Sequence, residues 1–360
     1  MFTFVLGTKA ELIKTVPVMK ELERRNYEYL FIHTGHHDIK KMCEEFDVKE
    51  PDIVLFRSPK ATSKFFLNTF KALRWSSFLS YKLLKTLSKI KSRFLLVHGD
   101  TITTAVTSIT SFFCPFKNWL TCHLEAGLRS FDFLEPFPEE ISRVVADNFC
   151  DILFAVSDGA EKNLKKENVK GKIVKTGNTI VDSVKLALKR GKKSKRKKFV
   201  LVNLHRNENL QSKSRMKKIV EILNSVTLPI YWPIHDQTKY ALKKYNLWKN
   251  VKNNKNIEFS GLISYFQFLQ EMRKCKFVIT DGGSIQEESL ILKKPCVILR
   301  MKTERVEGLK TGINFLTKLN VEYAKQIIER LEGKFKIPKF KNPYGDNKVS
   351  KRIIEFLVNL

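Results

Sequence analysis

The sequence predicts an α/β protein built from two Rossmann-like domains that face a central cleft. First, short apolar runs typical of buried strands alternate with amphipathic stretches, as in parallel sheets covered by helices. Second, this alternation stops at the strongly basic residues 189–198 and then starts again. Third, a chain of 360 residues is longer than one hydrophobic core usually supports, so two domains of similar size are expected.

The expected strands fall into two groups, one on each side of the basic stretch. Between them lie helical patterns, as where Leu12, Val16, Met19 and Leu22 repeat on one helical face. The domains are therefore expected at residues 1–185 and 199–345, with a basic linker at 186–198 and a C-terminal helix at 346–360. The strands are expected at residues 2–6, 29–33, 94–98, 120–124, 152–156, 172–175, 199–204, 230–234, 257–259, 277–280 and 296–299.

Composition excludes several classes of protein. No segment approaches the roughly 18 uncharged apolar residues of a spanning helix, so no membrane span is expected. The six cysteines are scattered without metal-binding spacing, which predicts free thiols in a cytoplasmic protein. A net charge of +29 would suit nucleic acid, a membrane surface or a phosphate-bearing substrate. Because the lysines are dispersed and not interleaved with aromatic residues, a solvated surface is favoured over nucleic-acid binding.

Carboxylates recur where strands of the first domain end. Asp100 follows residues 94–98, and Glu125 ends the next expected strand. Glu139 follows two prolines and opens a helix, with Arg143 one turn beyond. Acids gathered at one sheet edge repel unless a cation or a proton compensates, so they indicate acid/base chemistry. The alternative for Asp100 is a helix N-cap.

The second domain offers groups suited to a nucleotide. Residues 277–284 read as a strand entering a glycine turn before a helix, where backbone N–H groups at Gly283 can meet a phosphate. Ser284 adds a hydroxyl, and Glu288, one turn on, can accept the hydroxyls of a ribose. His205 ends the first strand of this domain and supplies a titratable imidazole.

Taken together, these segments resemble the motifs of the UDP-N-acetylglucosamine 2-epimerases, in the order of that family and over nearly the whole chain. The segments are residues 7–14 (GTKAELIK), 98–101 (HGDT), 123–130 (HLEAGLRS), 138–140 (PEE) with Arg143, 176–179 (TGNT), 205–209 (HRNEN), 286–288 (QEE), 303–305 (TER) and 342–346 (NPYGD).

The resemblance implies a GT-B fold whose C-terminal helix crosses back to the first domain. It also implies a homodimer, no metal or redox cofactor, and a role in polysaccharide biosynthesis. The implied reaction inverts C2 by eliminating UDP to a 2-acetamidoglucal and adding it back. The family's catalytic positions match Asp100, Glu125, Glu139 and His205, and the implied substrate-binding residues are Lys9, Lys14, Arg129, Phe268, Gly283, Ser284, Glu288 and Arg305.

The chain departs from the family pattern at several motifs. Lys9-Ala10 stands where Arg-Pro is common, which replaces a forked guanidinium with a point charge. Asp281-Gly282-Gly283-Ser284 replaces Asp-Ser-Gly-Gly and moves the hydroxyl by two positions. His36-His37 and Gln237-Thr238 replace residues of the activator site in bacterial members, which places substrate activation in question.

Three other functions stay open from sequence. A hydrolysing 2-epimerase would release N-acetylmannosamine and UDP, and Ala10 is reminiscent of that branch. The Glu-Ala-Gly-Leu-Arg and Pro-Glu-Glu segments favour the non-hydrolysing branch. A GT-B glycosyltransferase would need an acceptor, and it would not need three acids beside His205. A non-catalytic binding protein would not need the catalytic positions.

Overall fold

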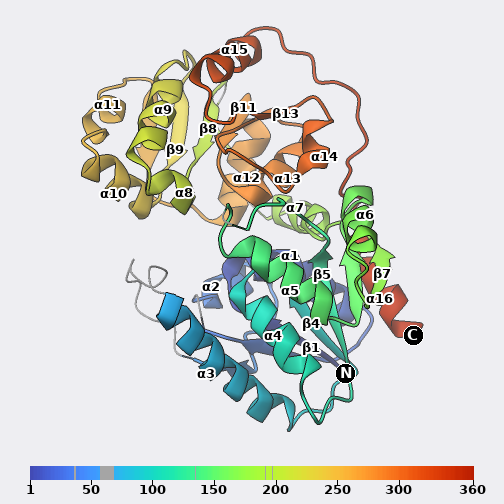
Figure 1. Ribbon diagram of the computed structural model, residues 1–360. Coiled ribbons are helices and arrows are strands. Elements are labelled where there is room, and N and C mark those ends of the chain that lie inside the picture. The colour runs from blue at the N-terminus through green and yellow to red at the C-terminus, as the bar shows by residue number, and fades with distance from the viewer. Residues whose placement is uncertain (36–37, 57–68, 134, 191, 197) are drawn as a thin grey trace. The chain divides into compact units, whose positions relative to one another are not determined.

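A computed structural model describes residues 1–35, 38–56, 69–133, 135–190, 192–196 and 198–360. The chain forms two compact units (Figure 1). The first unit comprises Met1–Ser183 and Tyr344–Leu360, and the second comprises Val184–Pro343. The boundary between them falls inside one helix, α7 (Ile180–Leu188).

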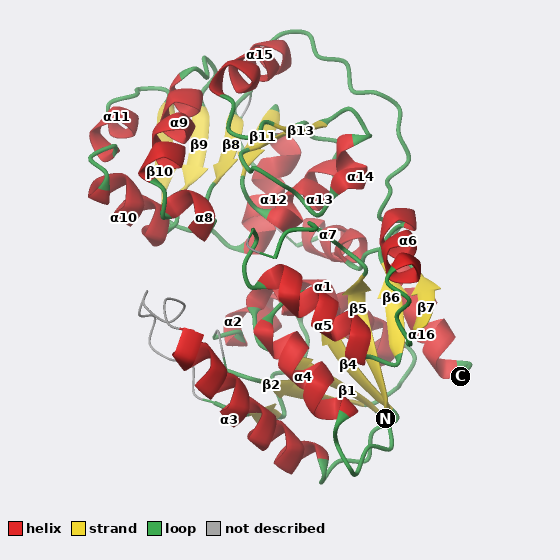
Figure 2. Ribbon diagram, viewed as in Figure 1, coloured by secondary structure: helices red, strands yellow, loops and turns green. Residues whose placement is uncertain are grey.

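The first unit is a parallel sheet with helices on both faces (Figure 2). Its strand order is β3-β2-β1-β4-β5-β6-β7. The strands β1 and β4 are buried along their whole length, as expected for a sheet covered on both sides. The strands are β1 (Phe2–Leu6), β2 (Tyr29–His33), β3 (Ile53–Val54), β4 (Phe94–His98), β5 (Leu120–Ala126), β6 (Ile152–Ala155) and β7 (Lys172–Lys175). Besides α7, the helices are α1 (Lys9–Arg24), α2 (Lys40–Phe46), α3 (Thr69–Leu87), α4 (Ile102–Phe112), α5 (Glu139–Phe149), α6 (Asp158–Lys166) and α16 (Val349–Val358).

The second unit repeats this architecture with strand order β10-β9-β8-β11-β12-β13. All of its paired strands are parallel. The strands are β8 (Val200–Asn203), β9 (Ile230–Pro233), β10 (Ile257–Ser260), β11 (Phe277–Thr280), β12 (Cys296–Ile298) and β13 (Asn314–Leu316). The helices are α8 (Asn207–Leu210), α9 (Lys213–Asn224), α10 (Asp236–Lys244), α11 (Trp248–Lys252), α12 (Tyr265–Lys274), α13 (Gly283–Ile291), α14 (Val306–Leu309) and α15 (Val321–Glu332).

Each strand expected from the sequence is present, and the described residues add the edge strands β3 and β13. These two have only two and three residues, too few for a periodic pattern to be recognised. In both sheets the strand order reverses beside the first strand, between β1 and β4 and between β8 and β11. Ligands of open α/β sheets bind outside the carboxyl ends of strands at such a reversal. The residues that follow β4, β8 and β11 therefore lie where each sheet would bind a ligand.

The last helix, α16, belongs to the first unit, where it packs against α1. The backbone N–H and the hydroxyl of Ser350 both donate to Asp182 at 2.7 Å. Arg352 donates to the carbonyl oxygen of Thr176 at 2.6 Å. These contacts fix the end of the chain beside α7.

The basic segment at residues 186–198, expected to be a linker, makes ordered contacts where it is described. Residues 186–188 complete α7, so the helix runs into the segment expected to be a linker. The side chain of Ser194 is buried and donates to Glu271 at 2.5 Å. Arg196 pairs with Glu258 and lies 3.7 Å from the ring centre of Tyr231. The described part of this segment is thus packed onto the second unit.

Candidate active site

Glu125 lies at the carboxyl end of β5 in a conformation that non-glycine residues rarely adopt, with φ of 73°. The strand pairing is interrupted at this residue, between Leu124 and Ala126. Strained backbone of this kind is concentrated at functional sites, because the surrounding structure must hold it there. The surrounding structure therefore holds Glu125 in an unusual backbone conformation at the point where the pairing of β5 is interrupted.

Two donors hold the Glu125 carboxylate. The Lys14 ammonium forms an ion pair with it, and both side chains are 5% exposed. The Asn178 amide donates to the same oxygen at 2.9 Å. His98 lies 3.8 Å from the other oxygen, and burial lowers the pKa of His98 to about 3, so this imidazole is neutral near pH 7. Lys14, implied by the resemblance to bind substrate, is thus the counter-ion of Glu125 in this structure.

Asp100 is held by a different cation. Arg143 of α5 forms an ion pair with Asp100 and donates to Glu140 at 2.8 Å. Burial of Arg143 opposes its charge, yet Asp100 and Glu140 outweigh burial and raise its pKa. The N-cap of α4 is Thr101, whose hydroxyl accepts from the backbone of Thr104. The alternative role of Asp100 as that cap is therefore wrong.

Glu139 is the first residue of α5, directly after Pro138. It is partly buried and lies one helical turn before Arg143. The carboxylate is favoured at this position because helix N-termini stabilise negative charge.

The turn that carries Asp100 is also tied to α1. Glu11 accepts from the backbone of Gly7 at 2.8 Å and of Thr8 at 2.6 Å. The hydroxyl of Thr101 donates to Glu11 at 2.6 Å. Burial raises the pKa of Glu11, and these hydrogen bonds oppose that rise. The first two turns of α1 therefore hold the residue after Asp100 through Glu11 and the carboxylate of Glu125 through Lys14.

Arg129 pairs with carboxylates other than the candidate acids. Its guanidinium is 1% exposed and pairs with Asp147 at 2.7 Å and with Glu167 at 2.6 Å. His123 lies between Asp147, 2.6 Å from Nδ1, and the carbonyl oxygen of Gly99, 2.8 Å from Nε2. These buried contacts give Arg129 a supporting position and leave it little surface for substrate.

In the second unit, His205 follows β8 and is surrounded by polar groups. The carboxylate of Asp281 accepts from the backbone N–H of His205 at 2.9 Å and of Arg206 at 3.2 Å. The ring stacks on His235 with centroids 4.9 Å apart. Burial, then Arg206 and Arg300, lower the pKa of His205 to about 4. The imidazole is therefore neutral at physiological pH.

The glycine turn precedes α13, with Gly282 at the N-cap. A Cβ added at Gly283 would lie 2.7 Å from the Arg305 guanidinium, so a larger residue here would displace this cation from the turn. Arg305 also pairs with Glu304 and, at 3.2 Å, with Glu287. The turn thus joins backbone N–H groups at a helix N-terminus to a fixed guanidinium, which suits a phosphate.

The other residues expected to bind substrate differ in how deeply they are buried. Ser284 is partly buried in the first turn of α13, and Lys9 is exposed at the start of α1. Phe268 of α12 is 9% exposed. Glu288 is 3% exposed, and the Tyr265 hydroxyl donates to it. Sequence reasoning missed Tyr265, because a pairing between two helices leaves no local pattern.

Asn178, Asn203 and Asp281 are also part of these sites, although none was expected to be a site residue. Asn178 lies in a motif segment, and Asp281 directly precedes the glycine turn, so their positions offered a signal. Their partners are distant in sequence and appear only in the fold. His36 and His37 lie outside the described residues. Among the described residues, no group of three or more His, Cys, Asp or Glu side chains could hold a metal ion.

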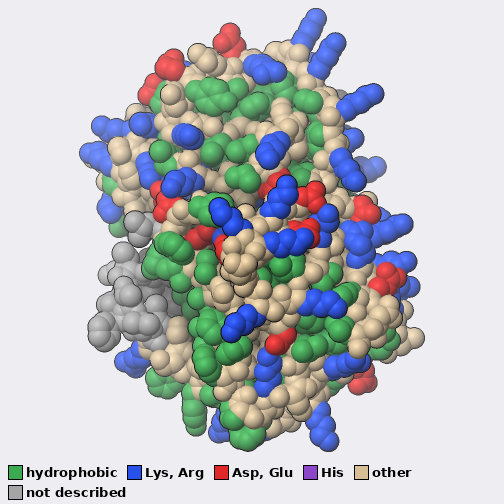
Figure 3. Space-filling view, turned by 45° about the vertical axis from the view of Figure 1, so that its right-hand side comes forward, with side chains coloured by type: hydrophobic (Ala, Val, Ile, Leu, Met, Phe, Trp, Pro, Cys, Tyr) green, Lys and Arg blue, Asp and Glu red, His purple; other side chains and the backbone are tan. Residues whose placement is uncertain are grey.

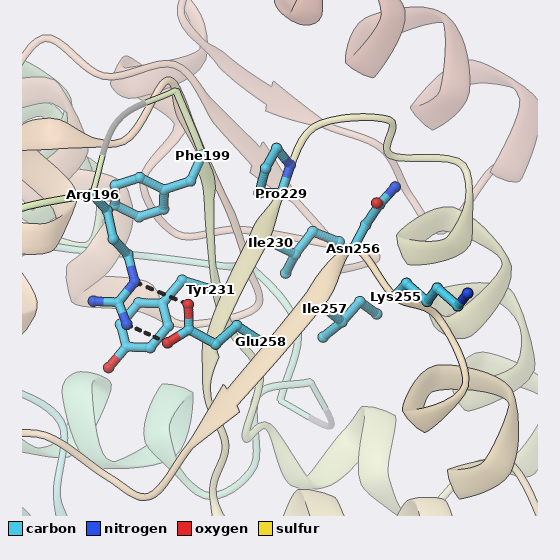
Figure 4. Close-up of a pocket in the computed structure, with 9 residues that line it drawn as sticks. All are labelled: Arg196, Phe199, Pro229, Ile230, Tyr231, Lys255, Asn256, Ile257 and Glu258. Atoms are coloured by element: carbon cyan, nitrogen blue, oxygen red, sulfur yellow. Dashed lines mark hydrogen bonds and ion pairs between the residues drawn. The ribbon is translucent and has the colours of Figure 1, made fainter.

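A separate cavity of about 390 Å³ lies at the amino ends of β8, β9 and β10 (Figure 4). Arg196 stacks over Tyr231 there, and two dashed contacts join it to Glu258. None of the expected site residues lines this cavity. It is therefore at the opposite end of the sheet from His205 and the glycine turn.

The chain has two parallel α/β units, with acids and a glycine turn at the ends of strands. These features define the GT-B type of sugar-nucleotide enzyme, and comparison with known proteins agrees. The family model for UDP-N-acetylglucosamine 2-epimerase matches residues 20–358. The UDP-N-acetylglucosamine 2-epimerase of Methanocaldococcus jannaschii is 34% identical, over 99% of this chain and 98% of the relative. The chain belongs to the UDP-N-acetylglucosamine 2-epimerase family, and it is an enzyme.

Two solved structures resemble the computed one. The Methanocaldococcus jannaschii UDP-GlcNAc 2-epimerase in complex with UDP-GlcNAc and UDP has a TM-score of 0.87 at 32% identity, covering 100% of this chain and 99% of that one. The Neisseria meningitidis enzyme bound to UDP-GlcNAc has a TM-score of 0.86 at 25% identity, covering 100% of both chains. In the described part of this chain, no helix is long and apolar enough to cross a membrane.

Proposed function

We propose that this enzyme interconverts UDP-N-acetylglucosamine and UDP-N-acetylmannosamine by inverting C2 through elimination and re-addition of UDP. The observation that supports this most is the pairing of two strand-end carboxylates with separate buried cations. Glu125 is paired with Lys14 and Asp100 with Arg143. Each cation favours the ionised form of its carboxylate, so the acids can stay charged and accept protons.

In this proposal a carboxylate of the first unit removes the proton from C2, and the bond from C1 to the UDP oxygen breaks. The products are 2-acetamidoglucal and UDP. A proton then returns to the opposite face of C2 while UDP adds back to C1. The C2 hydrogen is weakly acidic, so the leaving diphosphate must be stabilised as it departs. Asp100, Glu125 and Glu139 are the candidate acids.

The second unit would hold the nucleotide and leaving group. Arg305 and the N-terminus of α13 at Gly283 and Ser284 suit the diphosphate. Glu288 would accept from the ribose hydroxyls, with the Tyr265 hydroxyl donating to its carboxylate. His205 is the candidate titratable group on this side.

The test is NMR of the purified enzyme with UDP-N-acetylglucosamine in deuterated water. We expect UDP-N-acetylmannosamine to appear and deuterium to enter C2 of both sugars. Retention of the original hydrogen through turnover would refute the elimination. Accumulation of free N-acetylmannosamine with UDP would instead identify the hydrolysing reaction, and the same spectrum reports it.

We also propose that the enzyme is a homodimer formed through the apolar surface of α3, α4 and α5. These helices lie side by side, with α4 in contact with both neighbours. The sequence of α4 contains no charged residue. Figure 3 shows hydrophobic side chains gathered on the surface of the first unit. The exposed large apolar residues of this surface are Phe78, Tyr81, Ile109, Phe112, Phe113, Phe116 and Ile141.

Two physical arguments favour a second copy as the occupant. Monomers rarely expose apolar patches of several large side chains. Two copies with a net charge of +29 each repel one another, so they can approach most easily where the middle helix of the surface, α4, carries no charge. Sedimentation should show a dimer for the parent and a monomer for Phe113→Lys. The matched control is Tyr240→Lys, equally exposed on the second unit, which should remain a dimer. A monomeric parent would contradict the proposal.

A further inference from the structure

The His205 ring contacts the side chain of Asn203, the last residue of β8. The side-chain carbonyl oxygen of Asn203 lies 2.9 Å from Nδ1 of His205. A carbonyl oxygen can only accept a hydrogen bond, so this orientation of the amide puts the proton on Nδ1. The Asn203 amide nitrogen lies 3.4 Å from Nε2 of His235, where it can only donate. In this orientation the amide thus pairs with a protonated Nδ1 of His205 and an unprotonated Nε2 of His235.

The nearest carboxylate does not compete for this proton. Asp281 lies 3.8 Å from Nδ1 of His205, beyond hydrogen-bond distance. Its oxygens instead accept from the backbone N–H groups of His205 and Arg206 and from the side chain of Asn209. Asp281 therefore fixes the backbone of the turn, and the ring itself is oriented by an uncharged amide.

The other ring nitrogen is available. The side chain of His205 is 40% exposed, and within the described part of the chain Nε2 has no hydrogen-bonding partner. With the proton on Nδ1, a neutral ring presents a lone pair at Nε2. An uncharged amide does not stabilise an imidazolium as a carboxylate does.

We infer that Asn203 is a positioning residue that holds His205 as the Nδ1–H tautomer, with Nε2 kept as the proton acceptor of the candidate site. This inference deepens the proposed function and rests on it for the role of His205 in turnover. The tautomer itself does not depend on that function. The charged and titratable groups around the ring are His235 before α10, Asp281 after β11, Arg300 after β12 and its neighbour Arg206.

The first test reads the tautomer directly in the unliganded full-length protein. In ¹⁵N-histidine-labelled enzyme, assigned by comparison with His205→Gln, we expect His205 to show a protonated Nδ1 and an unprotonated Nε2 near pH 7. A proton on Nε2 would overturn the inference. This result is independent of catalysis, so it stands even if the epimerase reaction is not observed.

The second test replaces the amide with a carboxylate of the same shape. Asn203→Asp should move the titration of His205, followed by NMR, upward by about one to three pH units, because a carboxylate on Nδ1 stabilises the imidazolium. The acid limb of the kcat profile should move with it. The matched control is Asn256→Asp, which adds the same charge at the amino end of β10, beside Thr227. It should leave both titrations unchanged.

The outcomes separate the two ideas. If Asn203→Asp shifts the NMR titration of His205 but the parent enzyme epimerises no sugar, the positioning role holds and the proposed function fails. If the NMR titration of Asn203→Asp equals that of Asn256→Asp, the positioning role is wrong, whatever the activity. A purely structural Asn203 would alter stability and leave both pH profiles in place.

Discussion

Removing the cation from the Lys14–Glu125 pair should be one of the most damaging single changes in the first unit. Both side chains are 5% exposed, so Lys14→Met would leave a buried carboxylate without its counter-ion. Breaking a buried pair from one side costs about 3 to 5 kcal/mol. For a unit of about 200 residues, each kcal/mol lowers the melting temperature by about 2 to 4 °C. We therefore expect a loss of about 6 to 20 °C.

The charge, and not the lost packing, should carry this effect, and a double-mutant cycle can show it. Glu125→Gln removes the charge and keeps an oxygen for Asn178. The double variant Lys14→Met/Glu125→Gln should therefore recover much of the stability lost in Lys14→Met. The deficit of Lys14→Met should also shrink as the pH falls, because a protonated Glu125 needs no cation.

Calorimetry of the full-length enzyme, with the transition of the first unit followed across pH, provides the measurement. Lys20→Met is a suitable control, because Lys20 is also on α1 but forms its ion pairs at the surface. It should change stability by less than about 1 kcal/mol. If Lys14→Met melted like Lys20→Met, or if the cycle showed no coupling, the buried ion pair would not exist as described.

Three further outcomes follow from the site. Asp100→Asn and Glu125→Gln should each lower kcat by about a hundredfold or more while UDP affinity by calorimetry stays unchanged; loss of folding in both would point to structural roles. Glu288→Ala and Ser284→Ala should each weaken UDP binding at least about tenfold, with Tyr265→Phe as the smaller control, and unchanged affinity would remove the nucleotide from this turn. Because the pKa of His205 is about 4, its ring should stay neutral down to that pH. Protonation of His205 should therefore lower kcat/KM only as the pH falls through about 4. A limb near pH 6.5 that disappears in His205→Gln would contradict this.

The strands and the carboxylates at their ends could be predicted because both depend on local sequence. A buried parallel strand is an uninterrupted apolar run, and the polar residue directly after it must emerge at the sheet edge. That reasoning located Asp100, Glu125 and His205 and the glycine turn at Gly283. The alternative role of Asp100 as the N-cap of α4 was wrong by one residue, because Asp100 and Thr101 are both good capping residues and Thr101 is the cap, while Asp100 pairs with Arg143.

The sequence by itself determined the two α/β units, the family and the identity of the candidate acids, since periodicity and motif order are properties of neighbouring residues. Only the tertiary structure decided which cation belongs to which acid. Lys14 and Glu125 are 111 positions apart, and Arg143 and Asp100 are 43 apart. It also turned Arg129 inward and placed Asn203 on the His205 ring. Such pairings depend on how strands and helices are brought together in three dimensions, and no local pattern in the chain records that.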